Sequence, residues 1–382
     1  MRPSYSYAQF ILSLPHRWGE SIAYDGPSGV AIVQERDDRF ARRRIYGTIY
    51  TEYERCDGPV RHCGTSGEQG LFGGKNMKIV VIGAAGLLGR ALCRVFSSDW
   101  SVIAVTHADV DICDLPHTKE LIGHAHPDVV INAAAYTNVD GCESDPERAY
   151  SVNTLGACNV AIASRAVTAS HVYVSTDYVF DGEKEAPYVE SDPPAPLNVY
   201  GCSKLAGERE VQRNNPRSFI VRTSWLYGDG GGDYVHAILA AAQARQDLAV
   251  ASDQHGTPTW VDDLAHQIRV LVLSESFGLY HASAEGSCTR HAFALEILRQ
   301  AGYTGHPADK GATQFAPKSD PTNTFSVRPT RSEELNRRAR RPRNAVLENL
   351  SLKAQGLNVL PHWRDSLQAF ASCCSVFRGG KE

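Results

Sequence analysis

The chain has 382 residues, 42% hydrophobic and 21% charged, a balance typical of globular proteins that excludes disorder throughout. Its formal charge is −4, from 39 Lys and Arg against 43 Asp and Glu, so it lacks the basic excess that neutralises nucleic-acid phosphates, and we expect no nucleic-acid partner. Because no apolar run approaches the ~18 residues of a membrane span, we also expect no membrane association and a cytoplasmic protein.

The cysteines and histidines give no sign of a structural framework. Ten cysteines are scattered along a long chain without a Cys-x-x-Cys pair, so we interpret them as reduced thiols. The histidines show no His-Glu-x-x-His run or comparable ligand spacing. We therefore predict no metal site.

The two methionines, Met1 and Met77, divide the chain just before its first strand-like run. Residues 1–76 have no sustained helical or strand periodicity and end in a glycine-rich stretch, Gly64 to Gly74. We interpret them as a disordered N-terminal extension, either a linker or a stretch upstream of the usual start codon. The functional domain is expected to begin at Met77.

From Met77 onward, short apolar runs alternate with segments of helical length. The predicted strands are Lys78–Ile82, Val102–Val105, Asp128–Asn132, His171–Ser175 and Phe219–Arg222, and the predicted helices are Leu87–Phe96, Pro146–Ala166, Tyr200–Arg213 and Trp260–Leu273. This alternation requires crossover connections between parallel strands. The fold class predicted is α/β, a doubly wound parallel sheet of the Rossmann type.

The first strand-to-helix turn is rich in glycine and reads Gly83-Ala84-Ala85-Gly86-Leu87-Leu88-Gly89. Glycines at such a turn bring backbone N–H groups close to a pyrophosphate, and the helix N-terminus favours its negative charge. The strand, turn and helix around the motif predict a dinucleotide site. After a later strand, the small side chains Ala133, Ala134 and Ala135 leave room for a cofactor.

The second strand ends without a carboxylate, in Val105-Thr106-His107. A carboxylate there usually holds the ribose 2′-hydroxyl of NAD, so the sequence favours NADP(H), with Arg90 a candidate phosphate contact. Asp109 lies close enough in the loop to keep NAD(H) open. Asp111 and Ile112 are placed either to meet an adenine edge or, for the aspartate, to cap the helix after Pro116.

Thr176, Tyr200 and Lys204 are candidates for proton transfer. Thr176 stands at the end of a central strand, where open α/β sheets place their ligands. Tyr200 and Lys204 are four residues apart on a helix and so share one face. An ammonium group nearby is expected to lower the phenol pKa toward neutrality, which would make Tyr200 a general acid.

Taken together, these motifs make residues 77–382 similar to the extended short-chain dehydrogenase/reductases, and among them to the dTDP-4-dehydrorhamnose reductase family. Besides the glycine turn and Asn132–Ala135, the resemblance rests on Val139-Asp140 with Glu143, Ser175–Phe180, Pro196–Glu208, Arg222–Gly228, Asp253–Thr259 and Arg341–Leu347. It implies reduction of the C4 ketone of dTDP-4-dehydro-β-L-rhamnose, with NADPH as hydride donor. A dTDP-sugar is the partner that follows, and a homodimer is left open.

The resemblance also implies roles for individual residues. Thr176, Tyr200 and Lys204 match the catalytic set, and Thr176, Asp177 and Trp225 match sugar contacts. Trp225 suits stacking on a deoxysugar, with a buried core position as the alternative. Cofactor contacts match Gly83, Gly86, Leu87, Leu88, Gly89, Asp111, Ile112, Ala133, Ala134, Ala135, Val174, Tyr200 and Lys204.

The resemblance divides the chain into a dinucleotide-binding part over 77–228 and a smaller, mainly substrate-binding part over 229–382, with 260–275 able to return to the first. The polar, proline-containing stretch Tyr303–Arg340 predicts no regular structure. Arg341 is interpreted either as facing a diphosphate or as part of a solvated basic loop.

Two other functions remain open. One is a non-catalytic NADP-binding subunit like the regulatory subunit of methionine adenosyltransferase, which has a similar glycine turn. The other is a different nucleotide-sugar reductase or epimerase, which would keep Tyr200 and Lys204 without requiring Trp225. Fold alone does not separate them.

Overall fold

The computed structural model describes residues 76–318 and 320–377. The expected N-terminal extension, over residues 1–76, lies outside the described residues apart from its last residue.

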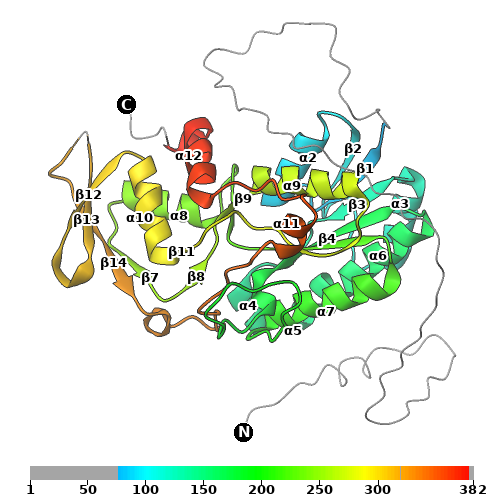
Figure 1. Cartoon of the computed structure of the whole chain (residues 1–382), viewed down its shortest axis with the longest axis horizontal. Helices are drawn as coiled ribbons and strands as arrows, with labels where there is room; N and C mark the ends of the chain where they lie inside the picture. Colours follow the sequence, from blue (N-terminus) through cyan, green and yellow to red (C-terminus); the bar gives the residue numbers. More distant parts are fainter. Residues whose placement is uncertain (1–75, 319, 378–382) are drawn as a thin grey trace, which may run out of the picture. The chain divides into compact units, whose positions relative to one another are not determined.

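A six-stranded parallel sheet forms the centre of the described part, with strand order β10-β5-β4-β3-β1-β2 (Figure 1). The central strands are buried along their length because helices cover both faces, which explains their unbroken apolar runs. The doubly wound α/β fold predicted from the sequence is confirmed. The strands are β1 (Lys78–Ile82), β2 (Ser101–Val105), β3 (Val129–Asn132), β4 (Ser170–Thr176), β5 (Ser218–Thr223) and β10 (Gly278–His281).

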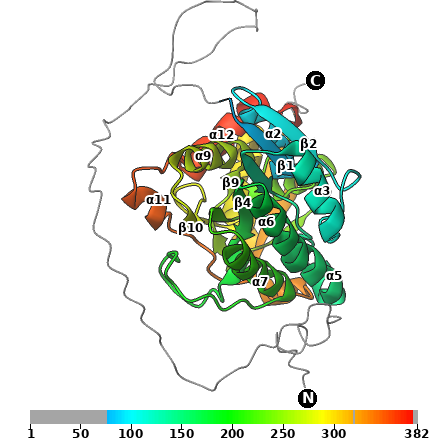
Figure 2. The same cartoon turned by 90° about the vertical axis from the view of Figure 1, so that its right-hand side faces the viewer.

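Helices cover the two faces of this sheet in separate groups (Figures 1 and 2). On one face α2 (Leu87–Phe96) packs against α9 (Val261–Ser274), sharing a buried cluster that includes Leu92 and Ile268. On the other face α6 packs between α3 and α7. The helices of that side are α3 (Leu115–Ala125), α4 (Val139–Ser144), α5 (Pro146–Tyr150), α6 (Ala157–Ala166) and α7 (Val199–Asn214), with a π-helical turn at Ser151–Gly156.

The chain beyond Gly228 contributes to both parts of the fold. It supplies α9 and β10 to the parallel sheet, and it also builds a second layer of helices and strands with its own buried aromatic cluster. That layer contains α8 (Tyr234–Gln243), α10 (Arg290–Gln300), α12 (Trp363–Cys373) and a four-stranded sheet in the order β12-β13-β14-β7. The remaining elements are the helix α11 (Leu350–Ala354) and the short strands β6 (Leu226–Tyr227), β8 (His255–Gly256), β9 (Thr259–Trp260) and β11 (Cys288–Thr289).

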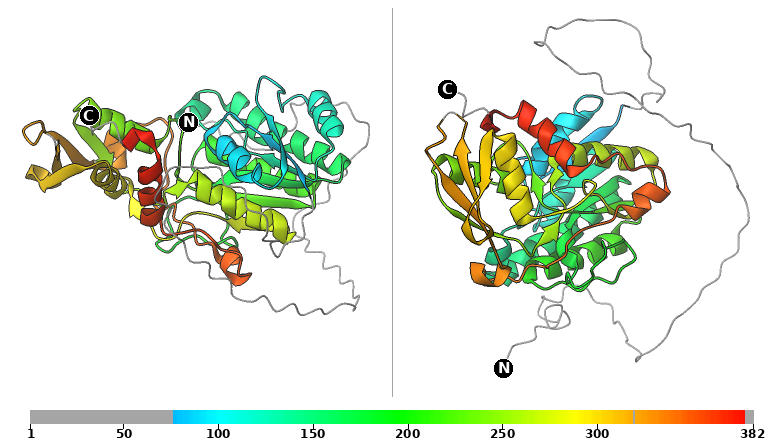
Figure 3. Two further views of the ribbon diagram at one scale, coloured as in Figure 1. Left: turned by 90° about the horizontal axis from the view of Figure 1, so that it is seen from above. Right: turned by 60° about the vertical axis from the view of Figure 1, so that its left-hand side comes forward.

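The expectation that Tyr303–Arg340 forms no regular structure is wrong. This stretch supplies β12 (Tyr303–Pro307), β13 (Thr313–Pro317) and β14 (Phe325–Thr330), and β14 pairs in parallel with the distant β7 (Leu248–Ala251). Figure 3 shows these strands on the side away from the parallel sheet. Because β12 is almost entirely exposed, its sequence carries no apolar alternation to reveal it.

Across the described residues, every helix is too short or too polar to cross a bilayer. In the same part of the chain, His, Cys, Asp and Glu side chains nowhere gather in a group of three or more that could hold a metal ion.

Candidate active site

Backbone atoms lie so near two positions of the glycine turn that neither has room for a Cβ atom. Gly83 has φ +80°, and a Cβ there would stand 2.7 Å from the backbone nitrogen of Ala134. A Cβ on Gly89 would stand 2.1 Å from the carbonyl oxygen of Gly83. The N-cap of α2, Gly86, makes no side-chain cap, so the first N–H groups of the helix are left for an anion. These features fit a dinucleotide pyrophosphate.

The end of β3 adds a buried donor beside this turn. The Asn132 side chain accepts a hydrogen bond from the Ala134 N–H through Oδ1 (3.1 Å), while its buried Nδ2 has no partner among the described residues. Ala133, Ala134 and Ala135 are half-buried, as is Val174 on the neighbouring strand. A buried amide without a partner is costly, so this position suits a polar ligand.

Asp109 and Arg90, both considered for the nucleotide end, make hydrogen bonds within the protein. The Asp109 carboxylate is engaged locally, because Oδ2 accepts hydrogen bonds from the N–H (2.8 Å) and Oγ1 (2.7 Å) of Thr106. Arg90 donates to the carbonyl oxygens of Ala85 (2.5 Å) and Asp229 (3.1 Å), which ties the glycine turn to the loop after β6. The guanidinium is thus a link within the protein.

Asp111 does not cap the following helix. That role falls to Asp114, whose Oδ1 accepts the His117 N–H at 3.1 Å. Asp111 is exposed and accepts the Cys113 N–H at 3.0 Å, whereas Ile112 is buried against Gly156. Asp111 therefore keeps a carboxylate oxygen at the surface where a nucleotide contact was predicted.

Thr176 and Tyr200 meet where β4 ends and α7 begins. Asn198 starts α7 by accepting the Gly201 N–H at 2.8 Å, and the carboxylate of Glu143 accepts the N–H of Val199 at 2.8 Å. These caps fix the first turn of α7, which carries Tyr200. The phenol of Tyr200 lies close enough to the Thr176 hydroxyl for that hydroxyl to influence its pKa, and its ring meets Tyr178 edge to face at 5.8 Å.

The Tyr200 pKa is raised, which differs from the expectation that Lys204 would lower it. Burial is the largest cause; the neighbouring Thr176 hydroxyl lowers the pKa, and the nearby Asp177 carboxyl raises it. Phenol ionisation is therefore suppressed at neutral pH. Tyr200 stands in the protonated form that a proton donor needs.

Lys204 is one turn further along α7 and is almost completely buried. Its Nζ donates to the Val174 carbonyl oxygen at 2.7 Å and lies 4.0 Å from the centre of the Tyr173 ring. Burial lowers the Lys204 pKa to about 7, and the carboxylate of Glu208 opposes that shift. The ammonium is thus held against β4 at Val174.

Asp177 is a buried carboxyl with little to compensate its charge. Oδ1 accepts the Thr176 hydroxyl at 2.9 Å, and Oδ2 has no partner among the described residues. Burial raises its pKa to about 7, although the Thr176 hydrogen bond and the Arg290 charge lower it. The carboxyl can therefore donate or accept a hydrogen bond near neutral pH.

Trp225 occupies a position between the two alternatives considered from the sequence. It is half-buried, and its φ of +46° is rare for a bulky residue, which marks a strained position next to the site. The Arg290 guanidinium covers its ring at 3.6 Å, and Gly256 lies against the indole with no room for a Cβ. Trp225 and Arg290 thus form one stacked surface, and sequence reasoning did not identify the arginine.

Three arginines gather at this edge of the site. Arg341 forms a bidentate ion pair with Asp140, with both N–O distances 2.7 Å, and holds the Asp140 pKa at about 2. Arg290 and Arg337 lie close enough to Tyr178 to influence its pKa. Arg341 therefore fastens its segment to α4, while Arg290 and Arg337 add positive charge that the sequence motifs did not reveal.

Comparison with known proteins gives a consistent result. The family profile described as RmlD substrate binding domain matches residues 77–375. A dTDP-4-dehydrorhamnose reductase of Streptomyces griseus is 39% identical over 303 residues, covering 77% of this chain and 93% of the relative. The spore coat polysaccharide biosynthesis protein SpsK of Bacillus subtilis is 36% identical over 294 residues, covering 77% of this chain and 96% of the relative.

Among solved structures, the dTDP-4-dehydrorhamnose reductase of Bacillus anthracis in complex with NADP is 34% identical. It superposes with a TM-score of 0.70, covering 78% of this chain and 99% of that chain.

Proposed function

Because the chain belongs to the RmlD substrate binding domain family, we propose that it is an NADPH-dependent reductase of dTDP-4-dehydro-β-L-rhamnose, which it converts to dTDP-L-rhamnose. The observation that carries the proposal is the meeting of Thr176, Tyr200 and Lys204 at the carboxyl end of β4. The glycine turn opens at the same edge of the parallel sheet, where ligands of such sheets bind.

The N-terminal and C-terminal parts of the described chain bind different ligands in this proposal. Residues 77–228 supply the dinucleotide-binding half, and residues 229–382 mainly the sugar-nucleotide half. The exceptions are α9 and β10, which return to the parallel sheet. The stretch 260–275, which was expected to return to the dinucleotide-binding part, falls on α9.

The proposed cofactor contacts lie along the carboxyl edge of the parallel sheet. The pyrophosphate would meet the N-terminus of α2 at Gly83, Gly86, Leu87, Leu88 and Gly89. The base would meet Asp111 and Ile112, and the nicotinamide end would lie among Ala133, Ala134, Ala135 and Val174, with Tyr200 and Lys204 beside it. The absence of a carboxylate on the last residue of β2 favours NADPH over NADH.

The reaction is a hydride addition followed by a proton transfer. Bound NADPH supplies the hydride that adds to C4 of the sugar, leaving NADP⁺. Tyr200 gives its phenolic proton to the C4 oxygen. This transfer is favourable because an alkoxide is a far stronger base than a phenolate. The Lys204 ammonium stabilises the phenolate that remains, and a proton from solvent restores Tyr200.

Recognition of the sugar nucleotide uses both sides of the site. Thr176 and Asp177 offer a hydroxyl and a carboxyl to sugar hydroxyls, and Trp225 offers an indole edge. The charges of Arg290 and Arg337 suit the diphosphate of a nucleotide sugar.

The test is to mix the full chain with NADPH and dTDP-4-dehydro-β-L-rhamnose and to follow loss of cofactor absorbance. We expect multiple turnovers, with NADPH preferred over NADH. Tight NADPH binding without turnover would instead support the non-catalytic subunit. Turnover with other 4-keto nucleotide sugars but not with this one would support another reductase.

A further inference from the structure

Three charged or titratable side chains from α7, β5 and β10 are buried and have no part in the proposed reaction. Glu208 and Arg222 are each 3% exposed, and His281 is fully buried. Charged groups are rarely buried so deeply unless their contacts compensate the loss of hydration. Their contacts lead directly to the residues that carry the proposed chemistry.

The Glu208 carboxylate receives hydrogen bonds at both oxygens. Oε1 accepts the Ser175 hydroxyl at 2.5 Å and the Arg222 Nε–H at 2.9 Å, and Oε2 accepts Arg222 Nη2–H at 2.7 Å. The ion pair is bidentate, so its geometry is fixed as well as its distance. Glu208 is therefore locked to both β4 and β5.

Ser175 lies between two other residues of β4, Val174 and Thr176, that also contact α7. The Val174 carbonyl oxygen accepts a hydrogen bond from the Lys204 ammonium, and the Thr176 hydroxyl lies close enough to Tyr200 to influence its pKa. On α7 the partners Tyr200, Lys204 and Glu208 follow one another at intervals of four residues, so they lie along one face of the helix. A shift of β4 along α7 would break all three contacts together.

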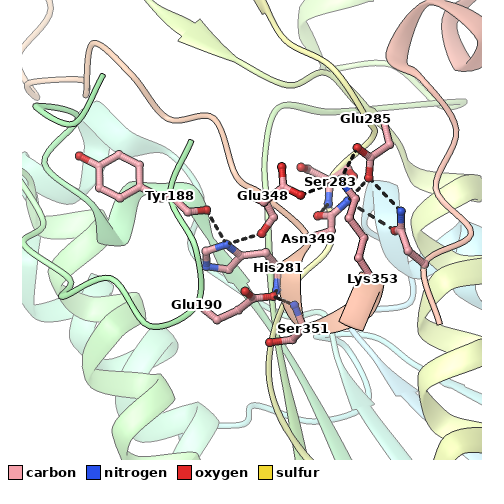
Figure 4. Close-up of polar contacts among 10 residues, drawn as sticks. Tyr188, Glu190, His281, Ser283, Glu285, Glu348, Asn349, Ser351 and Lys353 are labelled. Atoms are coloured by element: carbon pink, nitrogen blue, oxygen red, sulfur yellow. Dashed lines mark hydrogen bonds and ion pairs between the residues drawn. The ribbon is translucent and has the colours of Figure 1, made fainter. Parts of the chain in front are cut away.

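Arg222 is supported from the side away from Glu208. Its Nη1 lies 3.5 Å from Nε2 of His281, whose pKa burial lowers to about 3, so the imidazole is neutral and accepts at this nitrogen. As Figure 4 shows, Nδ1 of His281 points to the carbonyl oxygens of Tyr188 (3.0 Å) and Glu348 (3.2 Å). The Arg222 guanidinium is thereby held in line with Glu208.

Glu208 is also the negative charge that faces Lys204. Burial raises the pKa of both Tyr173 and Tyr200, so these phenols are neutral, and Arg222 is paired with Glu208 itself. Burial alone would discharge Lys204 more readily, and Glu208 opposes this.

From these contacts we propose that Glu208 is a positioning residue for the reaction. Its carboxylate holds Ser175, and with it Thr176, in register with Tyr200 and Lys204, and it keeps Lys204 in the ammonium form. The effect on turnover rests on the proposed function, whereas the effect on the Lys204 charge does not.

The experiment compares Glu208→Gln with the matched control Glu210→Gln in the full chain. Glu210 is on the same helix but partly exposed, where it pairs with Arg213. Glu208→Gln keeps the side-chain shape and removes the charge, so we expect kcat to fall about 10–100-fold with KM for the sugar nucleotide little changed. The alkaline limb of the pH–rate profile should move to lower pH. So should the midpoint of the Lys204 titration, which NMR of isotope-labelled lysines measures. Glu210→Gln should change none of these.

Folded Glu208→Gln with the kcat and the Lys204 midpoint of the wild type would overturn the proposal. If Glu208→Gln does not fold, Ser175→Ala decides, because it removes only one donor. A fall in kcat of about threefold or more at constant KM supports the proposal, and the wild-type kcat overturns it. Absence of turnover in the wild type would refute the proposed function alone, and the Lys204 midpoint would still test the role of Glu208.

Discussion

The two sides of the candidate site differ in burial and in charge. On the side of β4 and α7, Thr176, Asp177 and Lys204 are each at most 5% exposed. The Thr176 hydroxyl and the Lys204 ammonium are hydrogen-bonded to other protein groups. On the other side Arg290 is half-buried and Arg337 is exposed. Among the described residues, neither forms an ion pair like that of Arg222 with Glu208.

This difference separates chemistry from recognition. A buried, fixed set of groups shifts pKa values and needs no rearrangement when charge develops on the substrate oxygen. Exposed cations reach a charged diphosphate from solution without a large desolvation cost. We therefore expect substitutions on the buried side to change kcat and those on the exposed side to change KM.

The largest expected effect is that of Tyr200→Phe, which removes the proton donor and keeps the ring. We predict a fall in kcat of about 1,000-fold, with NADPH binding within about twofold of the wild type. Steady-state kinetics and cofactor fluorescence measure the two quantities. Undiminished turnover would remove Tyr200 from its assigned role.

Arg290→Ala should produce the opposite pattern. Losing this guanidinium uncovers Trp225 and removes a positive charge facing the substrate, so KM for the sugar nucleotide should rise about 10–100-fold while kcat changes little. Arg299→Ala is the matched control, because Arg299 lies on the same helix and makes only an exposed pair with Glu296. A fall in kcat at constant KM would contradict the division between the two sides.

A third effect concerns stability of the buried side in acid. Burial lowers the pKa of His171 on β4 to about 3, and neither ring nitrogen has a partner among the described residues. Between about pH 6.5 and 3 the unfolded chain binds a proton at this position and the folded chain does not. Stability should therefore fall with decreasing pH, by up to ~1.4 kcal/mol per pH unit for this one group.

His171→Leu should weaken this acid sensitivity without changing the stability profile above pH 7. Denaturant unfolding of both proteins at several pH values measures the difference. Equal slopes below pH 6 would mean that His171 does not remain neutral in the folded protein.

The smallest expected effect is that of removing residues 1–76, which precede the family match. Because both sides of the site lie within residues 77–382, the fragment should keep kcat and KM within about twofold of the full chain. A folded fragment without activity would refute the hypothesis that the functional domain begins at Met77.

Most of the buried side could be predicted from the sequence because its information is local. The glycines of the turn at 83–89 and the spacing of Tyr200 and Lys204 are visible within a few residues. The same spacing places Glu208 one turn after Lys204, so it could have been noticed. Its partner Arg222 could not, because that pairing depends on the order of strands in the sheet.

The exposed side could not be predicted in the same way. Arg290 reaches Trp225 only because α10 begins beside the chain that leaves β5, some 65 residues earlier in the sequence. The strand β12 is exposed and polar, so it follows no apolar pattern, and β14 is held by pairing with the distant β7. The expectation that Lys204 lowers the Tyr200 pKa is also wrong, because burial of the phenol raises this pKa.

The central claim is that the chain reduces a ketone at C4 of a dTDP-sugar with a hydride from NADPH. The most direct measurement uses NADPH deuterated at the transferable position of the nicotinamide, the full chain and dTDP-4-dehydro-β-L-rhamnose, with NMR of the isolated product. We predict dTDP-L-rhamnose with deuterium at C4. A product without deuterium at C4, or unchanged ketone with intact NADPH, would contradict it.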